Sequence, residues 1–171
     1  MRWALAAAAF SLFPLIGSCS PAEWVEVRPE DGGFSIQMPA APVETTQPVK
    51  TTSGPIALRM YVLEHGDFIY MVSFSDYAEE TLAVRTLEQL LDGARDGAAA
   101  SIRGEILDDA AISLSNHPGR YVVLRDPTGE LTLQIRLLLV GRRLYQFGVV
   151  TPRGDRSSAA VTRFLDSFAL L

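Results

Sequence analysis

The chain has 171 residues, of which 15 are basic and 20 acidic, so its formal net charge at pH 7 is −5. This length suits one domain with a single core, and 48% hydrophobic residues are enough to build that core. An acidic balance argues against nucleic acid as a partner, because phosphates attract a basic surface. The single cysteine excludes a disulfide within the chain, so stability has to come from burial.

The first 20 residues have the pattern of an export signal, MRWALAAAAFSLFPLIGSCS. Arg2 is the only charge in this stretch, and residues 3–16 are apolar, but they are too few to span a hydrocarbon core of ~30 Å as a stable helix. The letters IGSC, which end at Cys19, resemble the lipobox of bacterial lipoproteins, in which the cysteine is acylated before cleavage. We therefore expect a lipoprotein signal peptide over residues 1–18 and lipid attachment at Cys19.

The alternatives are an ordinary secretory signal cut near Ser18 or Ser20, or an uncleaved transmembrane anchor. In the lipoprotein interpretation, Ser20 stands where an aspartate would resemble a signal for retention in the inner membrane. The expected location is therefore the periplasmic side of the outer membrane. Residues 19–33 predict a lipid-anchored tether that reaches ~45 Å at about 3.3 Å per residue, with Trp24 packed on the domain. Residues 34–171 are then a single domain.

The first half of the domain is predicted to be β-rich. Apolar and polar residues alternate over residues 34–38, which indicates a half-buried strand. Residues 43–52 are β-branched and polar and predict an edge strand. Two further runs, residues 56–64 and 68–76, are separated by His65-Gly66-Asp67 and predict a hairpin.

Two amphipathic helices are predicted from residues spaced at helical intervals. The first has the stripe Leu87, Leu90, Leu91, Ala94 and Ala98. Thr86, followed three residues later by Gln89, resembles a capping box before it. The second begins at Ser157 or Ser158 and has the stripe Val161, Phe164, Leu165 and Phe168.

Residues 104–151 predict a four-strand meander with turns at residues 116–119, 126–129 and 141–143. A three-residue loop at 141–143 would bring the apolar residues of both flanking strands to one face, pairing Leu137 with Phe147. A two-residue loop at 141–142 would instead pair Arg136 with Phe147, so the three-residue loop is favoured. A type I turn at 126–129 would set Tyr121 and Val123 opposite Ile135 and Leu133. The whole pattern predicts an α+β fold: a mainly antiparallel sheet with two main helices packed on it.

Three segments together resemble a group of uncharacterised bacterial exported proteins: GGFSIQMP at residues 32–39, GRRLYQ at 141–146 and FLDSF at 164–168. The resemblance implies the PsbP-like α/β sandwich over about residues 30–171. That fold serves photosystem extrinsic subunits, trafficking factors and bacterial lipoproteins, so it constrains function weakly. No binding or metal site of those relatives matches this sequence residue by residue.

Chemistry-bearing motifs are scarce in this sequence. His65 and His117 both fall in predicted turns, and there is no HExxH motif and no G-x-S-x-G nucleophile elbow. Asp108 and Asp109 would point to opposite faces of a strand, which argues against a shared cation site. We therefore expect no catalytic residue, no metal site and no cofactor.

One basic constellation remains as a candidate site. The turns at 116–119 and 141–143 would lie at the same end of the meander, which groups His117, Arg120, Arg142 and Arg143 into a basic rim beside Asn116. Such a rim could bind a protein partner or an anionic envelope component, for example a lipid headgroup. The alternative is that these charges only keep the hairpin tips soluble.

These features predict a lipid-anchored, non-enzymatic periplasmic binding or accessory domain, attached to the membrane through its N-terminal lipid. The alternative is an envelope small-ligand enzyme or a stress-related hydrolase. An enzyme would need a buried polar cleft that holds a carboxyl or imidazole group with a shifted pKa.

Overall fold

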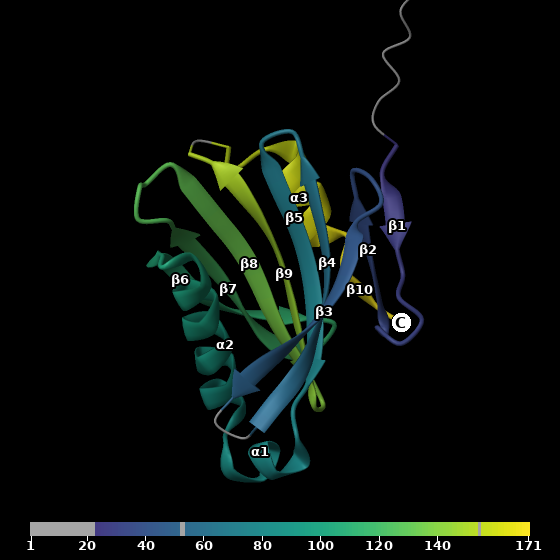
Figure 1. The fold of residues 1–171 in the computed structure, drawn as a ribbon, viewed down its shortest axis with the longest axis vertical. Helices are drawn as coiled ribbons and strands as arrows, with labels where there is room; N and C mark the ends of the chain where they lie inside the picture. Colours follow the sequence, from purple (N-terminus) through teal and green to yellow (C-terminus); the bar gives the residue numbers. More distant parts are fainter. Residues whose placement is uncertain (1–22, 52–53, 154) are drawn as a thin grey trace, which may run out of the picture.

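The computed structural model describes residues 23–51, 54–153 and 155–171. Within these ranges the chain forms two β-sheets and three helices (Figure 1). The large sheet has seven strands in the order β3-β4-β5-β9-β8-β7-β6, and the small sheet has three in the order β1-β2-β10. All neighbouring strands are antiparallel. The predicted α+β class with a mainly antiparallel sheet is therefore confirmed.

The elements follow one another along the chain with short connections. The large sheet contains β3 (Val43–Thr51), β4 (Gly54–His65), β5 (Phe68–Asp76), β6 (Glu105–Leu114), β7 (His117–Arg125), β8 (Leu131–Val140) and β9 (Arg143–Pro152). The small sheet contains β1 (Val25–Val27), β2 (Phe34–Met38) and β10 (Ala169–Leu170). The helices are α1 (Glu79–Val84), α2 (Leu87–Ile102) and α3 (Ala159–Asp166).

The fold begins earlier than the sequence predicted. Strand β1 pairs with β2, Val25 opposite Met38, so residues 25–27 of the predicted tether belong to the domain. A three-residue strand is too short to show a periodic pattern, which is why the sequence did not reveal it. Trp24 packs edge-on against Tyr70 with ring centroids 6.0 Å apart, as expected for a residue that covers the core. The predicted signal peptide and Cys19 lie outside the described residues.

Other elements pack on both faces of the large sheet. The small sheet and α3 lie on one face, and α2 lies on the other (Figure 1). Phe147 of β9 stacks on Phe168, just after α3, with ring centroids 4.2 Å apart on the first face. Leu90 and Leu91 of α2 belong to the core cluster on the opposite face. The central strands therefore lie between two hydrophobic cores, one on each side.

This double burial explains why the predicted β8–β9 register is wrong. The connection is the two-residue turn Gly141–Arg142, with Val140 paired to Arg143, and it places Arg136 opposite Phe147. Gly141 has a φ of 58°, which suits a tight hairpin turn. The prediction assumed one buried face, but Leu137 joins the core under α2 while Phe147 joins the core under α3.

The other two meander turns also differ in detail. The β7–β8 pairing sets Tyr121 opposite Arg136, one residue away from the predicted partner Ile135. The N–H of Gly129 donates to the carbonyl of Asp126 at 3.0 Å, so the predicted turn at residues 126–129 is confirmed. The β6–β7 turn is Ser115–Asn116 rather than residues 116–119, since Leu114 pairs with His117. Both turn residues have positive φ, 49° and 65°, which is the geometry of a two-residue type I′ hairpin.

The predicted helix caps and the β4–β5 hairpin agree with the structure. Leu87 of the first predicted stripe is instead 40% exposed, and Phe168 of the second lies beyond the end of α3. Thr86 and Gln89 form the predicted capping box of α2, and Ser158 caps α3. The β4–β5 hairpin turns through residues 66–67, and β3 is an edge strand. Helix α1 was not predicted. Among the described residues, no helix is both long enough and apolar enough to cross a membrane.

Candidate ligand-binding groove

The predicted basic rim is not assembled as one surface. The turns before β7 and between β8 and β9 do lie at the same end of the sheet, as expected, because these strands are antiparallel neighbours. Arg120, however, points to the α2 face, and Arg143 points to the face of the small sheet. Arg142 is exposed in its turn, and His117 is half-buried at the start of β7. The rim residues are thus split between two faces of the sheet.

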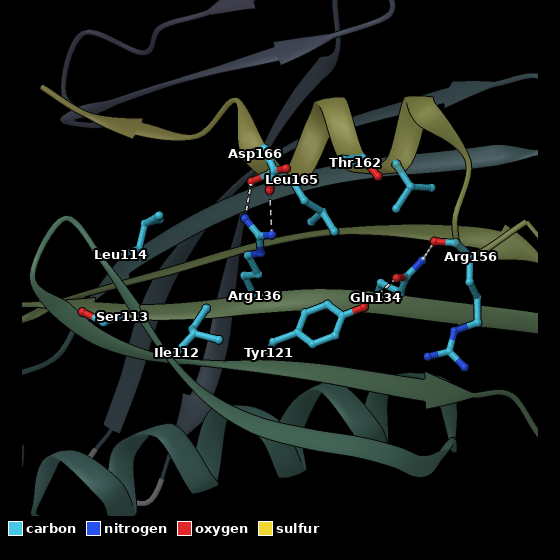
Figure 2. Close-up of a pocket in the computed structure, with 11 residues that line it drawn as sticks. Ile112, Ser113, Leu114, Tyr121, Gln134, Arg136, Arg156, Thr162, Leu165 and Asp166 are labelled. Atoms are coloured by element: carbon cyan, nitrogen blue, oxygen red, sulfur yellow. Dashed lines mark hydrogen bonds and ion pairs between the residues drawn. The ribbon is translucent and has the colours of Figure 1, made fainter.

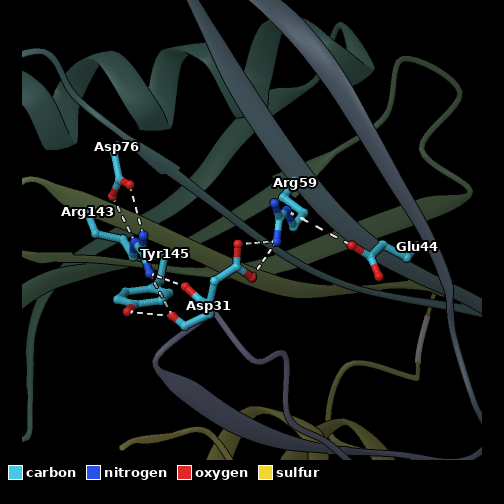
Figure 3. A network of polar contacts seen from close by, with 7 residues as sticks. Asp31, Glu44, Arg59, Asp76, Arg143 and Tyr145 are labelled. Carbon is cyan, nitrogen blue, oxygen red and sulfur yellow. Dashed lines mark hydrogen bonds and ion pairs between the residues drawn. The ribbon is translucent and has the colours of Figure 1, made fainter.

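Arg143 joins the small sheet to the large one (Figure 3). Its Nε and Nη2 donate to the two carboxylate oxygens of Asp76, each at 2.8 Å. Its Nη1 donates to the carbonyls of Asp31 at 2.6 Å and Gly32 at 3.2 Å. The hydroxyl of Tyr145 donates to the same Gly32 carbonyl at 2.9 Å. The Arg143 guanidinium lowers the pKa of the Asp76 carboxyl against the effect of burial.

Arg120 forms a second charged cluster, between α2 and the strands β6 and β7. It contacts the carboxylates of Asp92 on α2 and Asp109 on β6, and Arg95 of α2 also contacts both. Burial raises the pKa of Asp109, but hydrogen bonds from Arg95 and Arg120 outweigh it and leave the pKa below its ordinary value. Two of the four predicted rim residues, Arg120 and Arg143, therefore hold elements of the fold together.

A polar cleft lies between α3 and strands β6 to β8, with a volume of about 430 Å³ (Figure 2). The hydroxyl of Tyr121 donates to Oε1 of Gln134 at 2.6 Å, and Nε2 of Gln134 donates to the carbonyl of Arg156 at 2.9 Å. Arg136 donates to the carbonyl of Leu165 at 2.8 Å and to the Asp166 carboxylate at 2.7 Å. These polar groups are hydrogen-bonded to one another, so the main role of the cleft residues is to attach α3 to the sheet.

The most distinctive hollow is an apolar groove of about 600 Å³ between α2 and the sheet. Helix α2 packs on β7 and β8. The side of α2 that faces away from these two strands lies next to the uncovered face of β4 and β5, and the groove is the space between them. The sheet contributes large apolar side chains, which include Ile56, Leu58, Met60, Met71, Leu133 and Ile135. The helix contributes small residues, Gly93, Ala94, Gly97 and Ala98. We call this hollow the α2 groove.

Two glycines keep the α2 groove open. A Cβ atom added at Gly93 or Gly97 would meet no heavy atom within 4 Å. Glycine costs an α-helix about 1 kcal/mol relative to alanine, and neither position requires glycine for a close approach or a positive φ. Two glycines four residues apart inside an otherwise well-formed helix are the sequence signal for the groove.

Polar groups line one side of the α2 groove. Ser73, Ser75 and Tyr77 follow Met71 at alternate positions along and just after β5. The Ser73 hydroxyl donates to the carbonyl of Gln146 at 3.5 Å. Burial raises the pKa of Tyr77, and the charge of Arg85 acts in the opposite direction. Across residues 23–51, 54–153 and 155–171, no group of three or more histidine, cysteine or acidic side chains is placed to hold a metal ion.

The architecture has a counterpart among solved structures. The solution structure of cyanobacterial PsbP (CyanoP) from Synechocystis sp. PCC 6803 matches with a TM-score of 0.60 over 91% of this chain and 96% of that chain. This fold is PsbP-like. The sandwich implied by the three sequence segments is therefore confirmed.

The likeness extends to the fold alone, because the two sequences are only 14% identical. No family model matches the chain. No curated protein matches it in sequence. A PsbP-like fold therefore leaves the function to be argued from the groove itself.

Proposed function

We propose that this chain is a non-enzymatic binding protein of the periplasm, anchored by a lipid at Cys19, that takes an elongated apolar ligand in the α2 groove. The groove itself carries the proposal. Its volume of about 600 Å³ falls within the range of about 300–1,000 Å³ typical of small-molecule sites. Its walls are mainly apolar with a few polar groups, which is the usual composition of such sites.

The anchor places this groove close to a lipid surface. The support for the anchor is the lipobox-like sequence that ends at Cys19, and the support for the outer membrane is Ser20 after it. Because β1 begins at Val25, only residues 20–24 would separate the anchor from the fold. Five residues reach ~17 Å when extended, much less than the tether expected from the sequence.

The non-enzymatic part of the proposal is supported by the titratable groups. The described carboxyl groups with shifted pKa values are Asp76, Asp109 and Asp126, and all three values are lowered. A lowered pKa keeps a carboxylate ionised near neutral pH, whereas a carboxyl general acid requires a raised one. Each of the three accepts hydrogen bonds from neighbouring groups of the fold.

Binding of an uncharged apolar probe tests the proposal directly. N-phenyl-1-naphthylamine is titrated into residues 20–171, which contain every described element, and its fluorescence should rise and saturate at one probe per chain. Gly97→Leu should weaken this binding at least tenfold, because the leucine side chain enters the groove where a Cβ meets nothing within 4 Å.

Ala100→Leu is the matched control, since Ala100 is exposed on the same helix and does not line the groove. It should bind the probe as the wild type does. The proposal is wrong if the wild-type chain does not bind the probe, or if Gly97→Leu and Ala100→Leu bind it equally well.

A further inference from the structure

The floor of the α2 groove contains three polar side chains where the central strands β5 and β9 meet. Ser73 and Ser75 of β5 lie two residues apart and therefore on one face, and Gln146 of β9 pairs with Ser73. All three line the groove, and we call them the polar patch. Their neighbours in the floor are apolar, since Met60 of β4 pairs with Ser73 and Leu144 of β9 pairs with Ser75. The groove therefore offers one polar position within an apolar surface.

The fold satisfies the Ser73 hydroxyl poorly. Its oxygen lies 3.5 Å from the carbonyl of Gln146, whereas an ordinary O–H···O hydrogen bond measures about 2.5–3.0 Å. Ser73 is only 8% exposed, so few water molecules can reach it. A buried hydroxyl without a good acceptor destabilises the fold. A ligand oxygen in the groove would give this hydroxyl a better acceptor than the carbonyl does.

The described residues that line the groove are uncharged. They include no aspartate, glutamate, histidine, lysine or arginine. Burial raises the pKa of Tyr77, which also lines the groove, so this phenol stays protonated near neutral pH. An ionised ligand group placed here would lose its hydration and meet no opposite charge, which is strongly unfavourable. The lining therefore discriminates against ligand charges of either sign.

We infer that the ligand of the α2 groove is an uncharged lipid with one oxygen group, a hydroxyl or an ester, that binds with this group at the polar patch. This inference rests on the proposed function and adds the ligand's chemical class and the position of its polar group. A hydroxyl or an ester oxygen can accept a hydrogen bond from Ser73 or Ser75, while the chain covers apolar residues such as Met60 and Met71. A volume of about 600 Å³ holds on the order of 20 non-hydrogen atoms, at roughly 30 Å³ for a group the size of a water molecule.

Ligands that share one chain length and differ in charge test the chemical class. Dodecanol, methyl laurate, laurate and dodecyltrimethylammonium are each used to displace N-phenyl-1-naphthylamine from residues 20–171. The titrations are made at pH 8 and 0.15 M salt, where exposed charges more than about 8 Å apart are largely screened. The tighter of dodecanol and methyl laurate should displace the probe at a concentration at least tenfold lower than either ion. The same comparison identifies the oxygen group as a hydroxyl or an ester.

Removal of the two hydroxyl groups tests where the ligand oxygen binds. In a Ser73→Ala/Ser75→Ala double variant the affinity for the tighter uncharged ligand should fall at least fivefold. The affinity for N-phenyl-1-naphthylamine should stay within twofold, which also shows that the variant is folded. Ser101→Ala is the matched control, because the Ser101 hydroxyl already donates to the carbonyl of Ala98 within α2 at 2.7 Å. This variant should bind the uncharged ligand as the wild type does.

The possible results separate this inference from the proposed function. If laurate or dodecyltrimethylammonium displaces the probe as readily as the uncharged ligands do, the uncharged class is wrong and the proposed function stands. An unchanged affinity for the uncharged ligand in the double variant overturns the position of its oxygen at the polar patch. If none of the four ligands displaces a probe that does bind, the inference is wrong. A wild-type chain that does not bind the probe overturns the proposed function itself.

Discussion

Arg143 and Asp76 face each other across the β5–β9 pairing and are joined by two hydrogen bonds of 2.8 Å. The same guanidinium reaches the carbonyls of Asp31 and Gly32, just before β2 of the small sheet (Figure 3). One side chain therefore connects the ends of two central strands of the large sheet with the loop before β2 of the small sheet. A residue expected to bind an outside partner has a structural role instead.

Replacing this arginine should weaken the fold. Arg143→Gln leaves the Asp76 carboxylate and two backbone carbonyls without their donor, and we expect a loss of about 1–3 kcal/mol in the free energy of unfolding. Arg142→Gln, one residue earlier and exposed, should change it by less than about 0.5 kcal/mol. Urea unfolding followed by circular dichroism measures both, and similar losses in the two variants would show that Arg143 has no special role.

The same pair predicts a dependence of stability on pH. Hydrogen bonds from Arg143 lower the pKa of Asp76 in the folded chain, so the pair stabilises the fold above the unfolded pKa of about 3.9 and this stabilisation is lost as the pH falls through the folded value. The stability difference between the wild-type chain and Asp76→Asn should therefore be constant from about pH 7 to 5 and shrink below about pH 4. A difference that is the same at pH 7 and pH 3 would contradict the lowered pKa.

Replacing glycine by alanine should change the free energy of unfolding in opposite directions at Gly97 and Gly148. Gly97→Ala should raise the free energy of unfolding by up to about 1 kcal/mol, because the new Cβ meets nothing within 4 Å and the helix gains propensity. Gly148→Ala should lower it by more than about 2 kcal/mol, since the Cβ would lie 2.6 Å from the backbone oxygen of Gln134. Thermal unfolding of the two variants checks the signs. A destabilising Gly97→Ala would mean that α2 lies closer to the sheet than described.

The sequence was informative wherever one face of an element is buried. Four residues of the predicted α2 stripe, Leu90, Leu91, Ala94 and Ala98, are buried, and only Leu87 at its start is exposed. The Thr86 capping box is present as predicted. The β8–β9 register was wrong because Leu137, Leu138 and Leu139 are all buried. Alternation selects a register only when one face is solvated, so a strand apolar on both faces leaves the choice to the turn and to the layers packed around it.

The candidate site was harder to predict for a different reason. The α2 groove comes from the placement of α2 over β7 and β8 and from side chains that are missing at Gly93 and Gly97. A space between elements has no pattern in either element alone. The contacts of Arg143 likewise join residues 67 and 112 positions apart, so they follow from the sheet order and register and not from local sequence.

A chain of hydrogen bonds under α3 runs from Tyr121 through Gln134 to the backbone of Arg156. Gln134 is 4% exposed, accepts the Tyr121 hydroxyl at 2.6 Å and donates to the Arg156 carbonyl at 2.9 Å. Gln134→Leu would leave both partners unsatisfied at similar side-chain volume, which should cost about 1–3 kcal/mol of the free energy of unfolding.

The coupling between these two side chains can be measured directly. Tyr121→Phe should destabilise the wild-type chain but cost at least about 0.5 kcal/mol less in the Gln134→Leu background, where the hydroxyl has already lost its acceptor. Urea unfolding of the four proteins gives the coupling free energy, and Tyr145→Phe in both backgrounds is the control, because the Tyr145 hydroxyl donates to Gly32 instead. Strictly additive losses for Tyr121 and Gln134 would contradict the hydrogen bond between them. A positive coupling free energy would show that the polar groups of the cleft under α3 stabilise the fold. The α2 groove would then remain the candidate site for a ligand.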